Sequence, residues 1–387
     1  MCLIVCDPVK RILIGVTIDE QLQYRQALPQ ALVARGWEVH LVSEDGQRLR
    51  AFADQRGVFV HPMAMRRQPS PAHDLAALIS WIRLIRRVRP DVTMIGTPKA
   101  ALLGNLAAAI CRVPRRIHDL LGLRAEIATG LGRSILLALE RFTAARATEV
   151  LVVGESLRAR VIELRIASAT KSVVLGHGSA DGVDIDRYNR LSADQRGIGT
   201  LRGQLDLDPL KPTIGFVGRL ARDKGLPELA DALKRLRDRG LEVEVLIVGR
   251  VDDRSGYLEQ LEASGQRIIS AGYQFDPAPY YTVMDAFCLP SLREGLPNVV
   301  LEAMAAGAVV VASDATGNVD LVRPGSTGYL VPRRSAGELA DALEAAVRDI
   351  ERSERYSAAA LAMVAEHFDS RDVRDRILRY LTSSTAS

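Results

Sequence analysis

Residues 213–225 read TIGFVGRLARDKG, and the order of residue types in this stretch indicates how the chain folds. The first five residues are mostly apolar, which predicts a short buried strand at Thr213–Val217. Glycines and basic residues follow, and then the pattern of a helix over Leu226–Arg239, which Gly240 ends. A strand, a glycine-bearing turn and a helix in this order form one βα unit of a parallel sheet.

The same rhythm repeats on both sides of this stretch. Before it, strands are predicted at Arg11–Thr17, Glu38–Ser43, Val58–Pro62, Asp91–Gly96, Arg115–His118, Glu149–Val153 and Ser172–Leu175; after it, at Glu242–Val248, Ile268–Ala271, Ala286–Leu289, Val309–Ala312 and Gly328–Val331. Helical patterns such as Tyr24–Arg35, Asp74–Val88 and Ala336–Ile350 fill the intervals. The fold class is therefore α/β, with parallel sheets covered by helices on both faces.

We expect two Rossmann-like, doubly wound domains, because 387 residues exceed one ordinary core. The N-terminal domain is predicted to span residues 1–186 and the C-terminal domain residues 187–368. The polar, glycine-bearing stretch 182–212 is read as the connection between them, and residues 369–387 as a terminal helix that packs back on the N-terminal domain. The domains are expected to face each other across a cleft lined by the carboxyl ends of their strands, where α/β proteins bind ligands.

Composition excludes several classes of protein. The chain is 48% hydrophobic and 25% charged, so it is neither disordered nor fibrous, and its net charge of +4 is too small to indicate nucleic-acid binding. Cys2, Cys6, Cys111 and Cys288 lack metal-ligand spacing and are interpreted as buried thiols in a reducing compartment. The sequence shows neither a signal-peptide pattern nor a long apolar run, which favours a cytoplasmic protein.

The turn after Val217 carries groups suited to a diphosphate. Gly218 lets the backbone approach a ligand, Arg219 offers a planar fork for phosphate oxygens, and Lys224 adds a point charge. The stretch matches neither GxGxxG nor GxxxxGK[ST], which disfavours a nicotinamide cofactor. The alternative interpretation is a capped turn with solvated basic side chains.

A second turn, at residues 289–297, carries acidic groups and free backbone N–H groups. Glu294 precedes a predicted helix over 297–306, Glu302 lies within it, and the N–H groups of Gly295–Asn298 point outward as an anion or hydroxyl site. Carboxylates accept hydrogen bonds from vicinal hydroxyls, so these acids suit a ribose and a hexose. For either glutamate alone, a solvated surface acid is the competing interpretation.

In combination, these motifs resemble the family 4 retaining glycosyltransferases, which have the GT-B fold. The resemblance rests on Gly218-Arg219 with Lys224, on Pro290-Ser291, on residues 294–298 and 302–307, and on Val248-Gly249, Gly272-Tyr273, 317–320 and 325–332. It implies that Arg219 and Lys224 hold the donor diphosphate beside Gly218 and that Glu302 binds the ribose. It assigns the transferred sugar to Glu294 and to the backbone of Gly295, Leu296, Pro297 and Asn298, and the base to the region of Arg250 and Tyr273. The resemblance favours uridine as the base and leaves guanosine open.

Four stretches of the first domain resemble the capsule and O-antigen subgroup of that family, namely residues 117–126, 136–142, 154–158 and 175–184. This implies a sugar on a polyprenyl diphosphate as acceptor, with Arg25, Arg124 and Glu126 on the acceptor side. His118 is either a catalytic, acceptor-side group or an ordinary histidine at a strand end. Many relatives have histidine where Leu121 stands, and the first βα loop, residues 15–20, lacks the double glycine of many relatives.

The predicted function is transfer of a hexose from a nucleoside diphosphate sugar to a glycan acceptor in surface polysaccharide biosynthesis. The resemblance implies front-face attack with retained configuration, and no cofactor or metal. A nucleotide-sugar epimerase and a non-catalytic sugar-nucleotide sensor are the alternatives. Trp81, with nearby arginines and Arg66-Arg67, suits either core packing or peripheral contact with an anionic membrane at the inner face of the plasma membrane.

Overall fold

The computed structural model describes residues 9–66, 68, 70–250 and 256–383, apart from the side chain of Tyr24. Cys2, Cys6 and Arg67 lie outside these residues. The chain divides into two compact units. Unit 1 holds the described residues up to Leu121, Ala128–Asp181 and the chain from Arg374 onward; unit 2 holds Gly122–Ile127 and Gly182–Val373.

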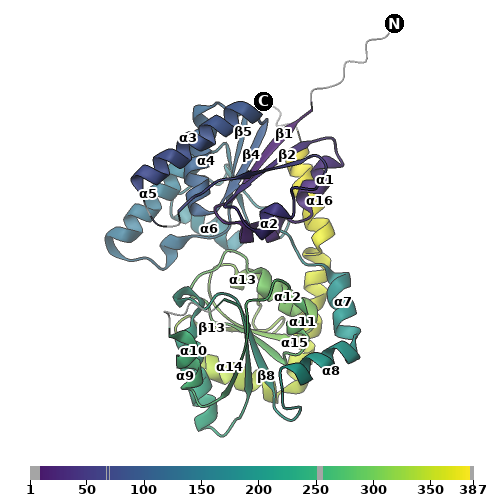
Figure 1. Ribbon diagram of the computed structural model, residues 1–387. Coiled ribbons are helices and arrows are strands. Elements are labelled where there is room, and N and C mark those ends of the chain that lie inside the picture. Colours follow the sequence, from purple (N-terminus) through teal and green to yellow (C-terminus); the bar gives the residue numbers. More distant parts are fainter. Residues whose placement is uncertain (1–8, 67, 69, 251–255, 384–387) are drawn as a thin grey trace. The chain divides into compact units, whose positions relative to one another are not determined.

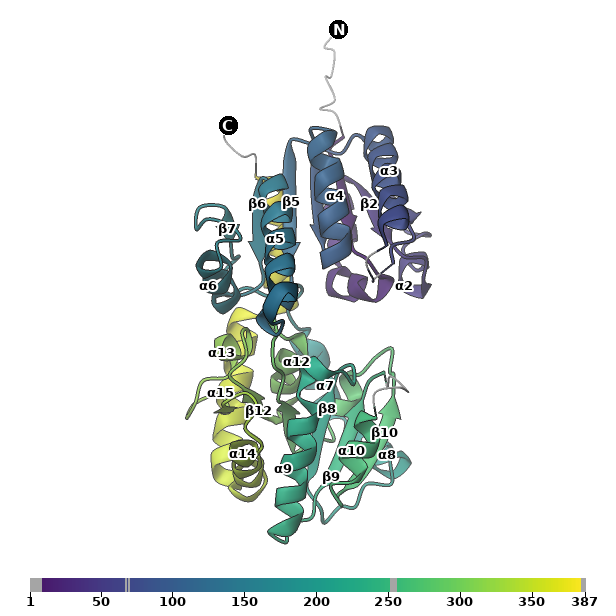
Figure 2. The ribbon, with the colours of Figure 1, turned by 90° about the vertical axis from the view of Figure 1, so that its left-hand side faces the viewer.

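Unit 1 is built on a seven-stranded parallel sheet in the order β3-β2-β1-β4-β5-β6-β7 (Figure 1). Its strands are β1 Arg11–Gly15, β2 Glu38–Ser43, β3 Val58–Pro62, β4 Val92–Gly96, β5 Arg115–Leu120, β6 Glu149–Val152 and β7 Ser172–Val173. Its helices are η1 Asp19–Arg25, α1 Leu28–Val33, α2 Gln47–Arg50, α3 Pro71–Val88, α4 Pro98–Ile110, α5 Gly130–Arg146 and α6 Glu155–Glu163. Figure 2 shows α3, α4 and α5 side by side in front of this sheet, with α4 packed between the other two.

Unit 2 repeats the arrangement on six parallel strands in the order β10-β9-β8-β11-β12-β13. They are β8 Thr213–Val217, β9 Glu244–Val248, β10 Arg267–Gly272, β11 Ala286–Leu289, β12 Val309–Ser313 and β13 Tyr329–Val331. The helices and turns are η2 Arg124–Glu126, α7 Ile185–Ala193, α8 Gln195–Gln204, η3 Arg222–Lys224, α9 Leu226–Asp238, α10 Tyr257–Glu262, α11 Ala278–Tyr281, α12 Asn298–Ala306, α13 Asn318–Leu321, α14 Ala336–Arg348 and α15 Ile350–His367. The predicted doubly wound α/β class is confirmed for both units.

The core of unit 1 centres on Trp81, which is fully buried between α3, α4 and the sheet. A side chain at Gly15 of β1 would overlap the indole, so this glycine is needed for the helix to approach the strand. The headgroup contact considered for Trp81 is therefore wrong, because its ring has no exposed surface. None of the helices in the described part of the chain has the length and hydropathy that a bilayer-spanning segment requires.

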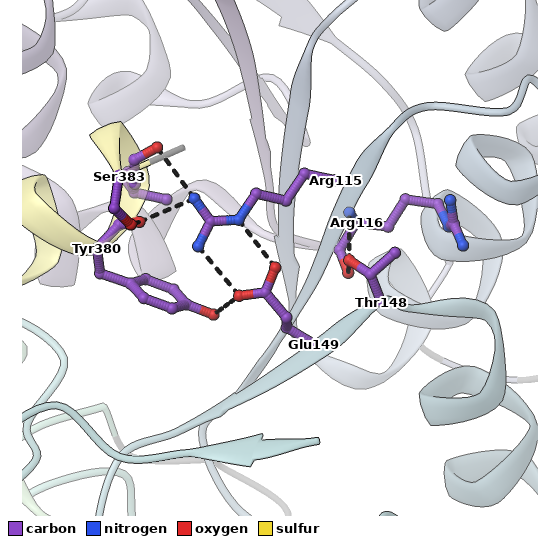
Figure 3. Close-up of polar contacts among 7 residues, drawn as sticks. Arg115, Arg116, Thr148, Glu149, Tyr380 and Ser383 are labelled. Atoms are coloured by element: carbon purple, nitrogen blue, oxygen red, sulfur yellow. Dashed lines mark hydrogen bonds and ion pairs between the residues drawn. The ribbon is translucent and has the colours of Figure 1, made fainter. Parts of the chain in front are cut away.

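The last helix, α16 Ser370–Thr382, begins in unit 2 and ends in unit 1. Its end is fixed by Arg115 of β5, whose Nη1 donates to the carbonyl oxygens of Tyr380 and Leu381 at 2.8 and 3.0 Å (Figure 3). The same guanidinium donates hydrogen bonds to both carboxylate oxygens of Glu149. The Glu149 carboxylate also accepts a hydrogen bond from the Tyr380 hydroxyl group. Arg115 thus satisfies carbonyl groups that the helix terminus leaves without intrahelical donors.

Several predicted helix bounds are corrected. The helix expected at Tyr24–Arg35 is the turn η1 followed by α1, which starts at Leu28 because Pro29 fits only a first helical turn. The connection 182–212 contains α7 and α8, and α15 follows α14 where no helix was expected. The helix predicted from Pro297 starts at Asn298, with Pro297 at the N-cap.

Candidate functional site

The candidate site lies where the strand order of unit 2 reverses. Strands β8 and β11 are neighbours at this point, and their connections run to helices on opposite faces of the sheet. Parallel strands bring their carboxyl ends to one edge, so the turn 218–225 after β8 and the turn 290–297 after β11 meet there. Open α/β sheets bind ligands in this crevice.

Backbone contacts hold the two turns together. The Leu292 N–H donates to the carbonyl of Asp223 at 2.9 Å. Gly225 has φ +70°, and a Cβ atom there would overlap the carbonyl oxygen of Pro290. Because only glycine allows both that φ and that approach, Gly225 sets the spacing of the turns. The side chains add a further link, since Arg293 Nη2 donates to Asp223 Oδ2 at 2.8 Å.

The predicted phosphate and sugar groups meet across this junction. Lys224 Nζ lies 2.6 Å from Glu294 Oε1, and the two side chains are only 16% and 12% exposed. Arg219 is largely exposed, with its guanidinium 3.8 Å from Asp223 Oδ2. The structure thus gathers a sheltered ammonium, a carboxylate and an exposed guanidinium at one edge of the sheet. Such a set can hold an anion next to a polyhydroxylated group.

The start of α12 forms the floor of this region. Gly317 has φ +82°, and a Cβ atom on it would overlap the carbonyl oxygen of Gly295, so the backbones pack directly on each other. Leu296 and Pro297 are buried. The Asn298 Oδ1 atom is buried and has no hydrogen-bond partner among the described residues. The first N–H groups of α12, which have no intrahelical acceptors, come directly after the turn that carries Glu294.

Glu302 lies one turn further along α12 and faces α11. Tyr281 is fully buried against Tyr188 and Phe287. Its hydroxyl group donates a hydrogen bond to Glu302 Oε2 at 2.7 Å. Burial raises the pKa of Glu302 to about 7, while the Tyr281 hydrogen bond opposes that rise. This carboxylate is positioned by a rigid neighbour and is close to its titration point at neutral pH.

Arg250 and Tyr273 follow β9 and β10, the two strands that lie on one side of β8 in the sheet. The Gly249 N–H donates to the carbonyl of Gly272 at 2.8 Å, which aligns the ends of β9 and β10. The Arg250 guanidinium carbon lies 5.3 Å from the centroid of the exposed Tyr273 ring. The pair offers an exposed flat surface on the sheet edge that also carries the turn after β8.

Of the residues predicted on the acceptor side, Arg25 lies in unit 1 and is buried. Its Nη2 donates to Asp119 Oδ2 at 2.8 Å, and the neighbouring Asp181 has its pKa raised to about 6 by burial. Asp119 and Asp181 were not singled out from the sequence, although Asp119 stands next to His118 at the end of a predicted strand. Burial of this cluster identifies it as a charge network at the carboxyl edge of β5.

His118 does not end its strand, since β5 continues to Leu120. Its ring is buried, and Nε2 lies 3.8 Å from Glu140 Oε2 of α5. The expected strand-end geometry is therefore wrong.

Arg124 and Glu126 belong to η2, a short turn whose contacts are with unit 2. Glu126 Oε1 accepts from Thr316 Oγ1 at 2.6 Å, while Arg124 is exposed. Glu126 also lines a cavity of about 280 Å³ in unit 2, together with Ile127, Leu292, Asp314, Pro332, Arg333 and Arg334.

Throughout the described ranges, no three His, Cys, Asp or Glu side chains are grouped so that they could hold a metal ion.

Comparison with known proteins agrees with this geometry. Residues 211–349 match the family "Glycosyl transferases group 1", and residues 22–178 match "Glycosyl transferase 4-like domain". The chain is 30% identical to the capsular polysaccharide biosynthesis glycosyltransferase CapM of Staphylococcus aureus, over 86% of this chain and 87% of that protein. It is 25% identical to the UDP-Gal:alpha-D-GlcNAc-diphosphoundecaprenol alpha-1,3-galactosyltransferase of Escherichia coli, over 79% of both chains.

Among solved structures, HepE of Anabaena in complex with UDP and glucose superposes with a TM-score of 0.78. The match covers 97% of this chain and 100% of that one at 21% identity, so it shows the shared GT-B fold. Together with the two family matches, which cover most of both units, it establishes that the chain belongs to the family 4, or group 1, glycosyltransferases and is an enzyme of the GT-B fold.

Proposed function

We propose that this glycosyltransferase moves a hexose from a UDP-sugar to a hydroxyl group of a polyprenyl-diphosphate-linked glycan, with retention of configuration, in surface polysaccharide biosynthesis. The names of its relatives support this. The Staphylococcus aureus relative is named for capsular polysaccharide biosynthesis, and the name of the Escherichia coli relative specifies a UDP-sugar donor and a diphosphoundecaprenol-linked acceptor.

The observation that carries the proposal is the junction of Lys224 with Glu294, 2.6 Å apart at the point where the strand order reverses. In this proposal, the Lys224 ammonium and the Arg219 guanidinium hold the donor diphosphate, and Glu294 accepts hydrogen bonds from the sugar. Glu302 accepts hydrogen bonds from the ribose hydroxyls. The exposed face of Arg250 and Tyr273 receives the base.

The chemical step breaks the bond between the anomeric carbon and the β-phosphate oxygen. Negative charge grows on that phosphate, and Lys224, Arg219 and the N–H groups at the start of α12 stabilise it by preorganised electrostatics. The acceptor hydroxyl attacks from the same face, and its proton passes to a phosphate oxygen of the leaving group. These cationic groups supply the charge that a divalent ion supplies in other enzymes, so we propose a reaction without metal or cofactor.

A polyprenyl acceptor lies in a membrane, so the proposed reaction takes place at the inner face of the plasma membrane. Arg25, Arg124, Glu126 and His118 remain our candidates for acceptor-side groups. The charge network of Arg25 and Asp119 supports a role for that edge of unit 1 in positioning an anionic or polyhydroxylated acceptor.

The proposal is tested with the full-length enzyme, radiolabelled UDP- and GDP-hexoses, and a synthetic polyprenyl-diphosphate saccharide. We expect a lipid product that carries labelled hexose from UDP-sugar only, and an anomeric proton coupling that matches the donor. Transfer to no lipid-linked saccharide, or an inverted linkage, contradicts the proposal. Conversion of the donor sugar without any acceptor indicates an epimerase instead.

A further inference from the structure

The cavity that Glu126 lines in unit 2 lies beside the proposed donor contacts, at the carboxyl edge of the same sheet. Leu292 follows β11, Asp314 follows β12, and residues 332–334 follow β13, so successive strand ends supply most of its lining. The groups proposed to hold the diphosphate and the base follow β8, β9 and β10, on the other half of the sheet. The cavity therefore offers space for a second ligand group next to the turn that carries Glu294.

The two arginines of this cavity differ in the contacts that they already make. Arg333 Nε donates to Asp314 Oδ1 at 3.0 Å, and the Arg333 backbone N–H donates to the same oxygen at 2.9 Å. This pair neutralises Asp314. The Arg334 side chain is exposed and has no hydrogen-bond or ion-pair partner among the described residues. Its guanidinium is therefore the cationic group that the cavity offers to a ligand.

The backbone of Arg334 adopts a conformation that is rare in a connection between a strand and a helix. Its φ is +64°, in the left-handed region. Arg89, Arg112 and Arg165 also have positive φ values, but each lies within two residues of a helix end, where the left-handed region is common. Arg334 lies between β13 and α14. Such an outlier points to a functional constraint, and here it places a guanidinium at the cavity.

The other lining residues suit a sugar ring. Glu126 Oε1 accepts a hydrogen bond from Thr316 Oγ1 at 2.6 Å, which fixes the carboxylate in unit 2. Ile127 and Leu292 add apolar surface. Carboxylates accept hydrogen bonds from ring hydroxyls, and apolar side chains pack against the C–H face of a ring. The volume of about 280 Å³ is near the lower limit for small-molecule sites, so it accommodates a single ring.

We propose that this cavity binds a sugar unit that carries an anionic group, either a carboxylate or a phosphate. Arg334 contacts the anionic group, and Glu126 accepts hydrogen bonds from the ring hydroxyls. The acceptor glycan supplies this sugar, so the source of the ligand rests on the proposed function. The inference narrows the acceptor to saccharides with a uronic acid or a sugar phosphate near the hydroxyl that receives the hexose.

Other classes of ligand fit these residues less well. A divalent cation needs several oxygen ligands, whereas Asp314 is already paired with Arg333, and Arg334 would repel the ion. An apolar ligand would cover the Arg334 guanidinium without giving it a partner, which costs free energy. A small inorganic anion would pair with Arg334 but would lie near the Glu126 carboxylate without a hydroxyl group to donate to it.

The test titrates the full-length protein calorimetrically with glucuronic acid, glucose 1-phosphate, glucose, acetate and inorganic phosphate. We expect at least one of the two charged sugars to bind about tenfold more tightly than glucose, acetate or inorganic phosphate, because each of these lacks the anionic group or the hydroxyls. The tighter of the two charged sugars identifies the source as a carboxylate or a phosphate. Arg334→Asn is expected to lower that affinity about tenfold, since asparagine removes the charge and tolerates the positive φ.

Two variants serve as controls. Arg112→Asn removes an exposed arginine with φ +57° from unit 1 and is expected to bind the charged sugar as the unaltered protein does. Lys224→Ala removes the proposed diphosphate contact and is expected to keep this affinity, which separates the cavity from the donor site. Because Arg334 and Arg112 are both exposed, unchanged thermal unfolding shows that their variants are folded.

Equal affinity of the unaltered protein and Arg334→Asn for the charged sugars overturns the proposal, as does absence of binding or equal affinity for glucose or the small anions. Loss of binding in Lys224→Ala, with binding retained in Arg334→Asn, assigns the charged sugar to the donor site and also overturns it.

The transfer assay tests the source of the ligand separately. The charged sugar is expected to compete with the acceptor, and Arg334→Asn is expected to raise the KM for the acceptor more than it lowers kcat. An unchanged KM overturns the acceptor as the source. The titrations need no turnover, so failure of transfer by every form of the protein contradicts the proposed function and leaves the titration result standing.

Discussion

The Lys224 ammonium and the Glu294 carboxylate form a close ion pair, with 2.6 Å between Nζ and Oε1, although 70 residues separate them in the chain. The pair is sheltered from water, so its electrostatic interactions are stronger than those of exposed charges. It joins the group proposed to stabilise the leaving diphosphate to the group proposed to orient the sugar. A change on either side should therefore affect the chemical step more than binding of the acceptor.

Lys224→Ala is expected to lower kcat by about 10²–10³-fold and to leave the KM for the acceptor nearly unchanged, because the lost charge acts on the leaving group. Steady-state kinetics with the donor held at saturation measure this. Lys234→Ala, at an exposed position on α9, is the matched control and is expected to retain full activity. A Lys224→Ala enzyme with normal kcat would show that the ammonium does not act on the diphosphate.

Glu302 provides a pH-dependent prediction. Its pKa is raised to about 7, mainly by burial, while the charges of Arg187 and Asp276 act on it in opposite directions. The ionised carboxylate accepts two ribose hydrogen bonds, whereas the protonated form has lost one acceptor. UDP affinity is therefore expected to fall as the pH drops through 7.

The Tyr281 hydroxyl donates a hydrogen bond to Glu302 and thereby favours the ionised carboxylate. Tyr281→Phe removes this hydrogen bond, so the midpoint of the pH-dependent fall in UDP affinity should move to higher pH. Calorimetric titration of UDP across this pH range measures both effects. Tyr356→Phe, on α15, is the control and should leave the midpoint in place. A pH-independent affinity in the unaltered protein would contradict the assignment of Glu302 to the ribose.

The sequence was sufficient to predict where the strands lie, because short apolar runs such as Val309–Ala312 and Ala286–Leu289 are buried on both faces of parallel sheets. Helices α7, α8 and α15 were missed even though each has a local signal. Asp184, Asp194 and Asp349 are N-caps whose carboxylates accept from the backbone N–H three residues later. These caps are local signals of a helix start that the sequence analysis did not use.

The contents of the site were harder to predict than its position. The motifs identified Lys224, Glu294 and Glu302 as separate candidates, and strand order alone explains why their turns meet. The partners Tyr281 and Asp119 were not found, because which side chains touch across a sheet edge depends on packing that periodicity does not encode. Trp81 shows the same limit: its helix was predicted, but whether the indole faced the core or the surface was decided by Gly15 on the facing strand.

Arg115 and Glu149 provide a stability prediction for the anchor of α16. Arg115→Met leaves the Glu149 carboxylate without its guanidinium partner, which is expected to cost about 3 kcal/mol in the free energy of unfolding. Tyr380→Phe removes one hydrogen bond and is expected to cost about 1 kcal/mol. Urea unfolding monitored by circular dichroism measures both. Arg379→Gln, at an exposed position on the same helix, is expected to change the unfolding free energy little; an equal loss in that variant would contradict the anchor.

His61 and His40 predict how the stability of unit 1 depends on pH. His61 Nε2 lies 2.9 Å from His40 Nδ1, and burial, with the charges of His40 and Arg87, lowers the pKa of His61 to about 4. The pKa of His40 is also lowered, mainly by burial. Since an unfolded histidine titrates near 6.5, the unfolded chain binds more protons than the folded one between pH 6.5 and about 4.

Stability is therefore expected to be complete above pH 6.5 and to decline as the pH falls towards 4, by an amount on the order of 2 kcal/mol for this pair. Urea unfolding at a series of pH values measures the decline. His61→Gln removes one titrating group, so the slope of unfolding free energy against pH should become shallower. His73→Gln is the matched control, because His73 is exposed at the start of α3, and it should keep the original slope. Parallel slopes for His61→Gln and the unaltered protein would show that protonation of His61 is not linked to folding.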